Sequence, residues 1–79
     1  GASLQEVNLH QADLQGANLK GAHLVEADLQ GANLWRANLR ATNLEGARLQ
    51  GINAGKIEWG AKTKWSTGFT PSAKTVNNG

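Results

Sequence analysis

Ten leucines stand at every fifth position from Leu4 to Leu49, and this spacing excludes both common regular structures. On an α-helix, a step of five residues turns the chain by about 500°, so the leucines would not form one apolar face. On an unbroken strand, side chains alternate between two faces, so an odd spacing would place every second leucine on the opposite face. The spacing therefore requires a corner between successive leucines.

Each five-residue unit has the same internal order, with a small residue, a polar residue and then the leucine, as in Ala27–Asp28–Leu29. A short extended segment points the small residue and the leucine inward and the polar residue outward. Two positions after the leucine, a type II turn would need a positive φ. Glycines occupy this position at Gly16, Gly21, Gly31, Gly46 and Gly51. The same position in other units is occupied by Glu6, Gln11, Glu26, Arg36 and Ala41, and we expect those corners to use a turn type that does not require glycine.

A chain that turns the same way after every five residues must coil. Coils stacked about 4.8 Å apart pair their backbones as parallel strands do, so the pattern predicts an all-β solenoid with leucine inside. Such a fold is stabilised by stacking of neighbouring coils rather than by a globular core. The predicted core leucines are Leu4, Leu9, Leu14, Leu19, Leu24, Leu29, Leu34, Leu39, Leu44 and Leu49.

The repeated A(D/N)LxG word closely resembles the pentapeptide repeat family over residues 2 to about 56. The resemblance implies a right-handed quadrilateral β-helix with about 20 residues per coil. The spacing alone predicts a coil and leaves the number of sides open. Four sides would stack Leu4, Leu24 and Leu44 on one face. The polar residues before the leucines are then structural, because their short side chains can bond nearby backbone; they are Asn8, Asp13, Asn18, Asp28, Asn33, Asn38, Asn43 and Asn53.

After Leu49 the repeat decays, and Ala54 and then Trp59 take the next two leucine positions. Trp59 takes a leucine position, and we expect Trp59, Trp65 and Phe69 to pack over the last coil as a C-terminal cap. The run TKWSTGFTP also resembles the segment that follows the repeats in cyanobacterial members of the family. This gives three predicted segments: the β-helix over 1–56, the cap over 57–72 and a flexible tail over 73–79.

The chain enters the repeat directly at its first residues, so the sequence predicts an uncapped N-terminal coil. We expect further repeats to precede it in a longer natural protein. End-to-end self-association of two copies through that coil, or cover from a neighbouring molecule, are the alternatives.

The residues of the repeat offer no pattern for catalysis or for a cofactor. The serines lie at the edges of the repeat and neither His10 nor His23 is placed to activate one, so we expect no enzyme. The two histidines do not converge on a metal site, and the glycines follow the corners rather than a phosphate loop. The chain has no cysteine, which excludes disulfides.

One outward patch differs from the background, formed by Lys20, Trp35, Arg36 and Arg40. An exposed tryptophan beside arginine is a common anchor at protein interfaces, so these residues are the candidate interaction patch. The alternative is a solvated face on which Trp35 lies flat under an arginine.

These features predict a non-catalytic structural module that binds protein partners through its flat faces, within a larger protein like those of cyanobacteria. The alternative is a mimic of DNA that inhibits or protects a type II topoisomerase, as the resemblance implies for some members. That role needs an acidic rod, whereas residues 1–55 carry four basic and five acidic groups. Nucleic-acid binding rests on four lysines among the last residues and is the weakest hypothesis. No apolar run could span a membrane, and cytoplasmic is the default location.

Overall fold

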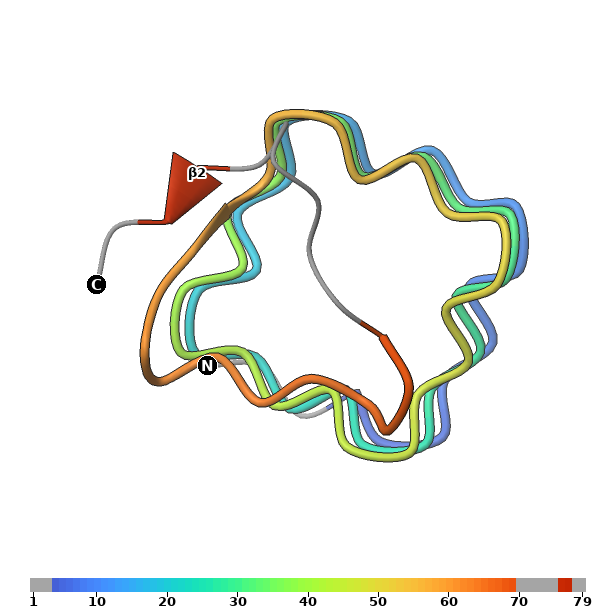
Figure 1. Cartoon of the computed structure of the whole chain (residues 1–79). Coiled ribbons are helices and arrows are strands. Elements are labelled where there is room, and N and C mark those ends of the chain that lie inside the picture. Colours follow the sequence, from blue (N-terminus) through green and yellow to red (C-terminus); the bar gives the residue numbers. More distant parts are fainter. Residues whose placement is uncertain (1–3, 70–75, 78–79) are drawn as a thin grey trace.

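The backbone winds into stacked coils in a computed structural model, which describes residues 4–69 and 76–77 (Figure 1). Parallel bridges join positions 20 residues apart, from Asn8 with Asp28 to Asn38 with Glu58. Since one unit has five residues, each coil contains four units and therefore four corners. The coil predicted from the leucine spacing is confirmed by this hydrogen-bonding pattern, and its number of sides follows from it.

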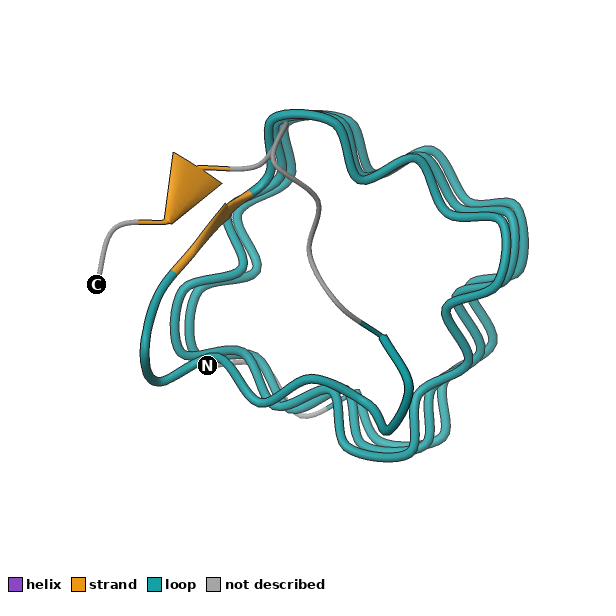
Figure 2. Ribbon diagram, viewed as in Figure 1, coloured by secondary structure: helices purple, strands orange, loops and turns teal. Residues whose placement is uncertain are grey.

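Two short strands stand out from this pattern. β1 (Glu58–Trp59) pairs in parallel with β2 (Val76–Asn77), with Glu58 opposite Val76 and Trp59 opposite Asn77. Elsewhere in residues 4–69 the coils meet at single-residue bridges between turns, which Figure 2 draws as loops. No helix among the described residues is long and apolar enough to cross a membrane.

The interior is filled by the leucines and by the small residues that precede them. Leu24, Leu29, Leu34, Leu39 and Leu44 are at most 1% exposed, because each has a coil on both sides. The leucines of the first coil are only half-buried and pack against this core; they are Leu4, Leu9, Leu14 and Leu19. Burying one leucine contributes about 1.5–3 kcal/mol, so stacking of coils is the main stabilising term.

Threonine replaces the small alanine at two stacked positions without leaving a buried hydroxyl unpaired. Thr42 Oγ1 donates a hydrogen bond of 2.8 Å to the Leu19 carbonyl, and Thr63 Oγ1 donates one of the same length to the Leu39 carbonyl. Both threonines are buried. The polar substitution is tolerated because the coil below supplies an acceptor.

The corners from Glu6 to Lys56 share one backbone conformation, with a positive φ at the residue two positions after the leucine position. The glycine corners have φ of 71–73°, and the corners at Glu6, Gln11, Glu26, Arg36, Ala41 and Lys56 have φ of 53–60°. In both kinds the small residue donates its N–H to the preceding leucine carbonyl, at 2.9 Å from Ala22 to Leu19 and 3.1 Å from Thr42 to Leu39. The expectation of a different turn type at the non-glycine corners is therefore wrong. Stacking in register requires the same reversal in every coil, and this outweighs the roughly 1–2 kcal/mol cost of the left-handed region.

The outward polar residues form the predicted contacts with the backbone. In eight units the Oδ1 atom accepts the backbone N–H two residues later, at 3.0–3.2 Å, as from Trp35 to Asn33. These contacts lie at the start of each corner and stabilise the turn. The acceptors are Asn8, Asp13, Asn18, Asp28, Asn33, Asn38, Asn43 and Asn53.

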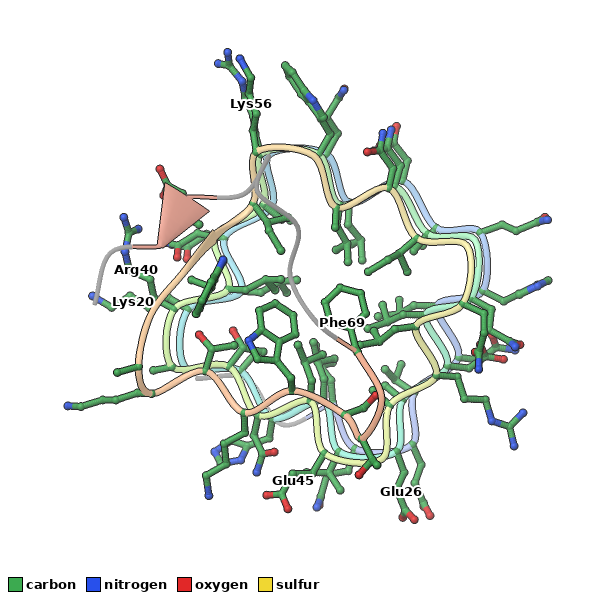
Figure 3. All side chains as sticks on the ribbon, viewed as in Figure 1. Lys20, Glu26, Arg40, Glu45, Lys56 and Phe69 are labelled. Atoms are coloured by element: carbon green, nitrogen blue, oxygen red, sulfur yellow. The ribbon has the colours of Figure 1, made fainter. Side chains whose placement is uncertain are left out.

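The repeat gains one residue after Trp59. Lys64 pairs with Asn43 at a separation of 21 residues instead of 20, so Trp65 stands where the next leucine above Leu44 would be. The rings of Trp59 and Trp65 meet edge to face at 5.9 Å, and the rings of Trp65 and Phe69 lie 5.0 Å apart. All three aromatic residues pack against the core, and Phe69 points over the end of the coil (Figure 3).

Candidate interaction surface

Trp35 lies on an outer corner with its indole against the backbone of the next coil. A Cβ built on Gly55 would be 2.6 Å from Cδ1 and 3.0 Å from Nε1 of Trp35. The backbone N–H of Trp35 donates a hydrogen bond to Asn33 Oδ1 at 3.1 Å, and Trp35 is half-buried. The indole is therefore held in one place while part of its surface stays exposed.

Two cations flank this indole. The guanidinium carbon of Arg36 lies 4.6 Å from the ring centroid, and Nζ of Lys56 lies 6.0 Å from it. Both distances are within the range of cation–π attraction. Arg36 and Lys56 occupy equivalent corners of successive coils, and Lys56 projects away from the coil in Figure 3. We call Trp35, Arg36, Gly55 and Lys56 the Trp35 corner.

The other two residues of the predicted patch lie at a different place. Lys20 and Arg40 project together from another side of the coil in Figure 3. Arg40 donates to Glu58 Oε1 at 2.8 Å, with side chains that are 33% and 43% exposed. An exposed pair of this kind contributes under about 1 kcal/mol, and Glu58 neutralises one of the two cations. The structure therefore divides the predicted patch into the Trp35 corner and a partly neutralised Lys20–Arg40 pair.

The side of the coil opposite Lys56 carries acidic residues. Glu26 and Glu45 project from it in Figure 3. Glu45 lies near one cation, since Lys64 Nζ is 3.8 Å from Glu45 Oε1, and both side chains are more than half exposed. Charge is thus distributed unevenly around the coil, with the basic Trp35 corner and the acidic residues on opposite sides.

The polar residues of the coil are engaged with the backbone rather than assembled into a reactive site. Asp13 and Asp28 each accept a backbone N–H, and His10 and His23 are exposed on the outer surface. Among residues 4–69 and 76–77 there is no group of three His, Cys, Asp or Glu side chains that could hold a metal ion.

Three residues that shape this surface were not singled out from the sequence. Gly55 accommodates the indole, Lys56 adds the second cation, and Glu58 pairs with Arg40. Gly55 lies 20 residues after Trp35 in the sequence. Because one coil of four units has 20 residues, this separation places Gly55 directly above Trp35. Lys56 stands in the same relation to Arg36.

A family model described as pentapeptide repeats matches residues 2–34 and 22–54, with eight copies of the repeat. Among solved structures, the chain is similar to Rfr23, a pentapeptide repeat protein from the cyanobacterium Cyanothece 51142, at 46% identity and a TM-score of 0.70. It is also similar to alr5209, a pentapeptide repeat protein from Nostoc Pcc 7120, at 33% identity and a TM-score of 0.60. No curated protein sequence gives a significant match.

These likenesses differ in how much of each protein they cover. The match with Rfr23 covers 81% of this chain and 47% of that protein, so the chain spans about half the length of Rfr23. The match with alr5209 covers 96% of this chain and 76% of that protein. Pentapeptide repeat proteins are right-handed quadrilateral β-helices, and this is the fold that the stacked four-cornered coils share with them.

Proposed function

The chain belongs to the pentapeptide repeat family, whose members are generally structural rather than catalytic. We therefore propose that it is a rigid, non-catalytic module that binds protein partners through its outer faces. The setting that we propose is a larger protein of cyanobacterial type, which the source of both similar structures supports. Fold alone does not define a function, so the proposal depends on the surface.

The single observation that carries the proposal is the fixed indole of the Trp35 corner. Tryptophan and arginine are enriched among the residues that dominate binding energy at protein interfaces. Here Gly55, which has no side chain, leaves room for the indole, and the guanidinium carbon of Arg36 lies 4.6 Å from the ring centroid. Because the ring is already ordered, a partner that covers it loses little conformational entropy on binding.

The charges at this corner favour an acidic partner surface. Arg36 and Lys56 stand on the same corner column, and no ion pair within the described residues uses either side chain. An arginine guanidinium matches a carboxylate through two parallel hydrogen bonds, and a nearby lysine adds attraction. We therefore propose a partner that places carboxylates around an apolar contact with Trp35.

The C-terminal aromatic residues are proposed to cap the β-helix. Trp59, Trp65 and Phe69 pack against the core at the end where the repeat stops, and β2, which lies in the tail segment, pairs with β1. An uncovered end would expose the apolar side chains of the core, so a cap over them limits stacking of coils into fibres. The proposed division remains a β-helix over 1–56, a cap over 57–72 and a tail over 73–79; residues 70–72 and most of the tail lie outside the described residues.

The test compares partner capture by the intact chain with capture by variants of the Trp35 corner. Trp35→Ala and Arg36→Glu should each reduce recovery of a specific protein at least about tenfold, since truncating a central interface residue costs 2 kcal/mol or more. Gln30→Ala, on a different corner, is the matched control and should leave recovery unchanged. The captured protein is then purified and its affinity is measured by calorimetry. Equal binding by all variants would contradict the proposed surface.

The topoisomerase alternative and direct DNA binding predict different results. A mimic of DNA should inhibit or protect DNA gyrase in a supercoiling assay at stoichiometric protein. A DNA-binding protein should shift DNA in a gel, with an affinity that falls steeply as salt rises. The proposed module should do neither.

A further inference from the structure

The second coil shows which backbone hydrogen bonds join one coil to the next. Leu29 N–H donates to the Arg48 carbonyl, and Gly31 N–H donates to the Gln50 carbonyl, each at 2.9 Å. In return, Arg48 N–H donates to the Ala27 carbonyl at 2.9 Å. Three backbone hydrogen bonds thus attach each side of a coil to the one above it.

The third coil has the same three groups on its upper side, and none of the hydrogen bonds found among the described residues uses them. They are the Leu49 N–H, the Gly51 N–H and the Ala47 carbonyl. Elsewhere in the third coil, Leu44 N–H donates to the Lys64 carbonyl at 2.7 Å and the Thr42 carbonyl accepts from Lys64 N–H at 2.9 Å, so residues 42–44 are paired with the chain above them. We call the backbone of residues 47–51 the open edge.

The open edge exists because the chain leaves the wall of the coil. A turn in which Phe69 N–H donates to the Ser66 carbonyl at 3.1 Å, with Gly68 at φ 89°, sends Phe69 over the end of the core. The red segment turns inward at this point in Figure 1. Between this turn and residues 47–50 there is a hollow of about 470 Å³, lined by Leu49 and Phe69 among others.

We propose that the open edge binds an extended segment of a partner protein, which adds to the coil as a parallel strand. Addition of a strand to an exposed edge is a recurring mode of peptide recognition, in which the backbone supplies affinity and the side chains supply specificity. The central residue of the segment donates its N–H to the Ala47 carbonyl and accepts from Leu49 N–H. The carbonyl two residues later accepts from Gly51 N–H.

The side chains of the third coil define the sequence that fits. The residues on either side of the central one point inward, above Ala47 and Leu49, so the first is small and the second is aliphatic. The central side chain points outward above Arg48, which is exposed and stands above Asp28 in the coil below. An acidic residue at the centre complements that arginine. The segment therefore has a small, an acidic and an aliphatic residue in that order, in an extended conformation. Its binding does not involve the Trp35 corner.

The binding test uses the full chain and a capped peptide of sequence ADLQG, which copies residues 27–31. With saturating peptide, amide exchange at Leu49 and Gly51, followed by NMR, should slow at least about tenfold. Methylating the aspartate nitrogen of the peptide removes the donor to Ala47 and should weaken binding about tenfold. Methylating the next leucine nitrogen, which faces away from the edge, is the matched control and should leave binding unchanged.

A second comparison tests the charge preference. Arg48→Glu should bind an AKLQG peptide better than ADLQG, the reverse of the intact chain, while Arg36→Glu should keep the original preference. Unchanged exchange at Leu49 and Gly51, or equal effects of the two methylations, would overturn the proposal. Slow exchange of both amides without peptide, together with a dimer in analytical ultracentrifugation, would overturn it in favour of a second copy on the edge.

Discussion

The indole of Trp35 occupies the space that a side chain at position 55 would need, since a Cβ there would lie 2.6 Å from Cδ1. Gly55 does not have the positive φ found at the corner glycines. Its lack of a side chain is therefore required by the neighbouring ring rather than by its own backbone conformation. This contact fixes where the indole lies and, with it, the surface that we propose for binding.

Replacing Gly55 by alanine should displace the indole from the coil. We expect a loss of about 1–3 kcal/mol in the free energy of unfolding, as for other overpacked sites. In a Trp35→Ala background the same replacement should cost much less, because the clashing ring is gone. Urea unfolding of the four proteins in this cycle measures the difference. Equal costs in both backgrounds would show that the two residues do not interact.

Truncating a leucine should cost most where coils lie on both sides. Leu29, which is fully buried, should lose about 2–5 kcal/mol on replacement by alanine. Leu9, which is half-buried in the same column one coil below, should lose less. The midpoints of urea unfolding give the comparison. A larger loss at Leu9 than at Leu29 would be inconsistent with stacking as the main source of stability.

The left-handed corners predict opposite effects for two exchanges of alanine and glycine. Ala41 has φ 58°, so Ala41→Gly should stabilise the protein by roughly 0.5–1 kcal/mol, after the added flexibility of the unfolded chain is counted. Gly16 has φ 71° and no heavy atom within 4 Å of an added Cβ, so Gly16→Ala should destabilise by about 1 kcal/mol through backbone strain alone. Thermal unfolding of both variants checks the signs. A fall in stability for Ala41→Gly would contradict the assigned corner conformation.

The side-chain contacts at the corners predict a distinction between two replacements of Asn33. Asn33→Ala removes the acceptor for Trp35 N–H and should cost about 1 kcal/mol. Asn33→Asp keeps an acceptor oxygen and should cost less. His23→Ala serves as a control, because His23 occupies the same outward position on an exposed site, and it should change stability by under about 0.5 kcal/mol.

The sequence predicts those parts of the fold that every unit repeats. The inward leucines and the outward Asn and Asp acceptors recur in so many units that one arrangement satisfies them all. The conformation at Glu6 or Ala41 was predicted wrongly, because register between coils determines φ there and local residue preference does not.

Contacts between coils were harder to predict from the sequence than contacts within a unit. Gly55 meets Trp35 only because 20 residues complete one coil, and the leucine spacing left that number open. The added residue before Trp65 has no signal in the decayed repeat, since no leucine marks the phase there. The open edge likewise depends on where the turn at Gly68 directs the chain.

The most direct test of the stacked coil uses disulfides, because the chain has no cysteine of its own. Asn18 and Asn38 form a parallel bridge, and Cα atoms about 5 Å apart suit a disulfide. The double variant Asn18→Cys, Asn38→Cys should therefore oxidise rapidly to an intramolecular disulfide in the folded protein. The control Asn18→Cys, Asn43→Cys pairs positions on different sides of the coil and should stay reduced. Rapid cross-linking of the control, or none of the first variant, would contradict the 20-residue coil on which the proposed surfaces depend.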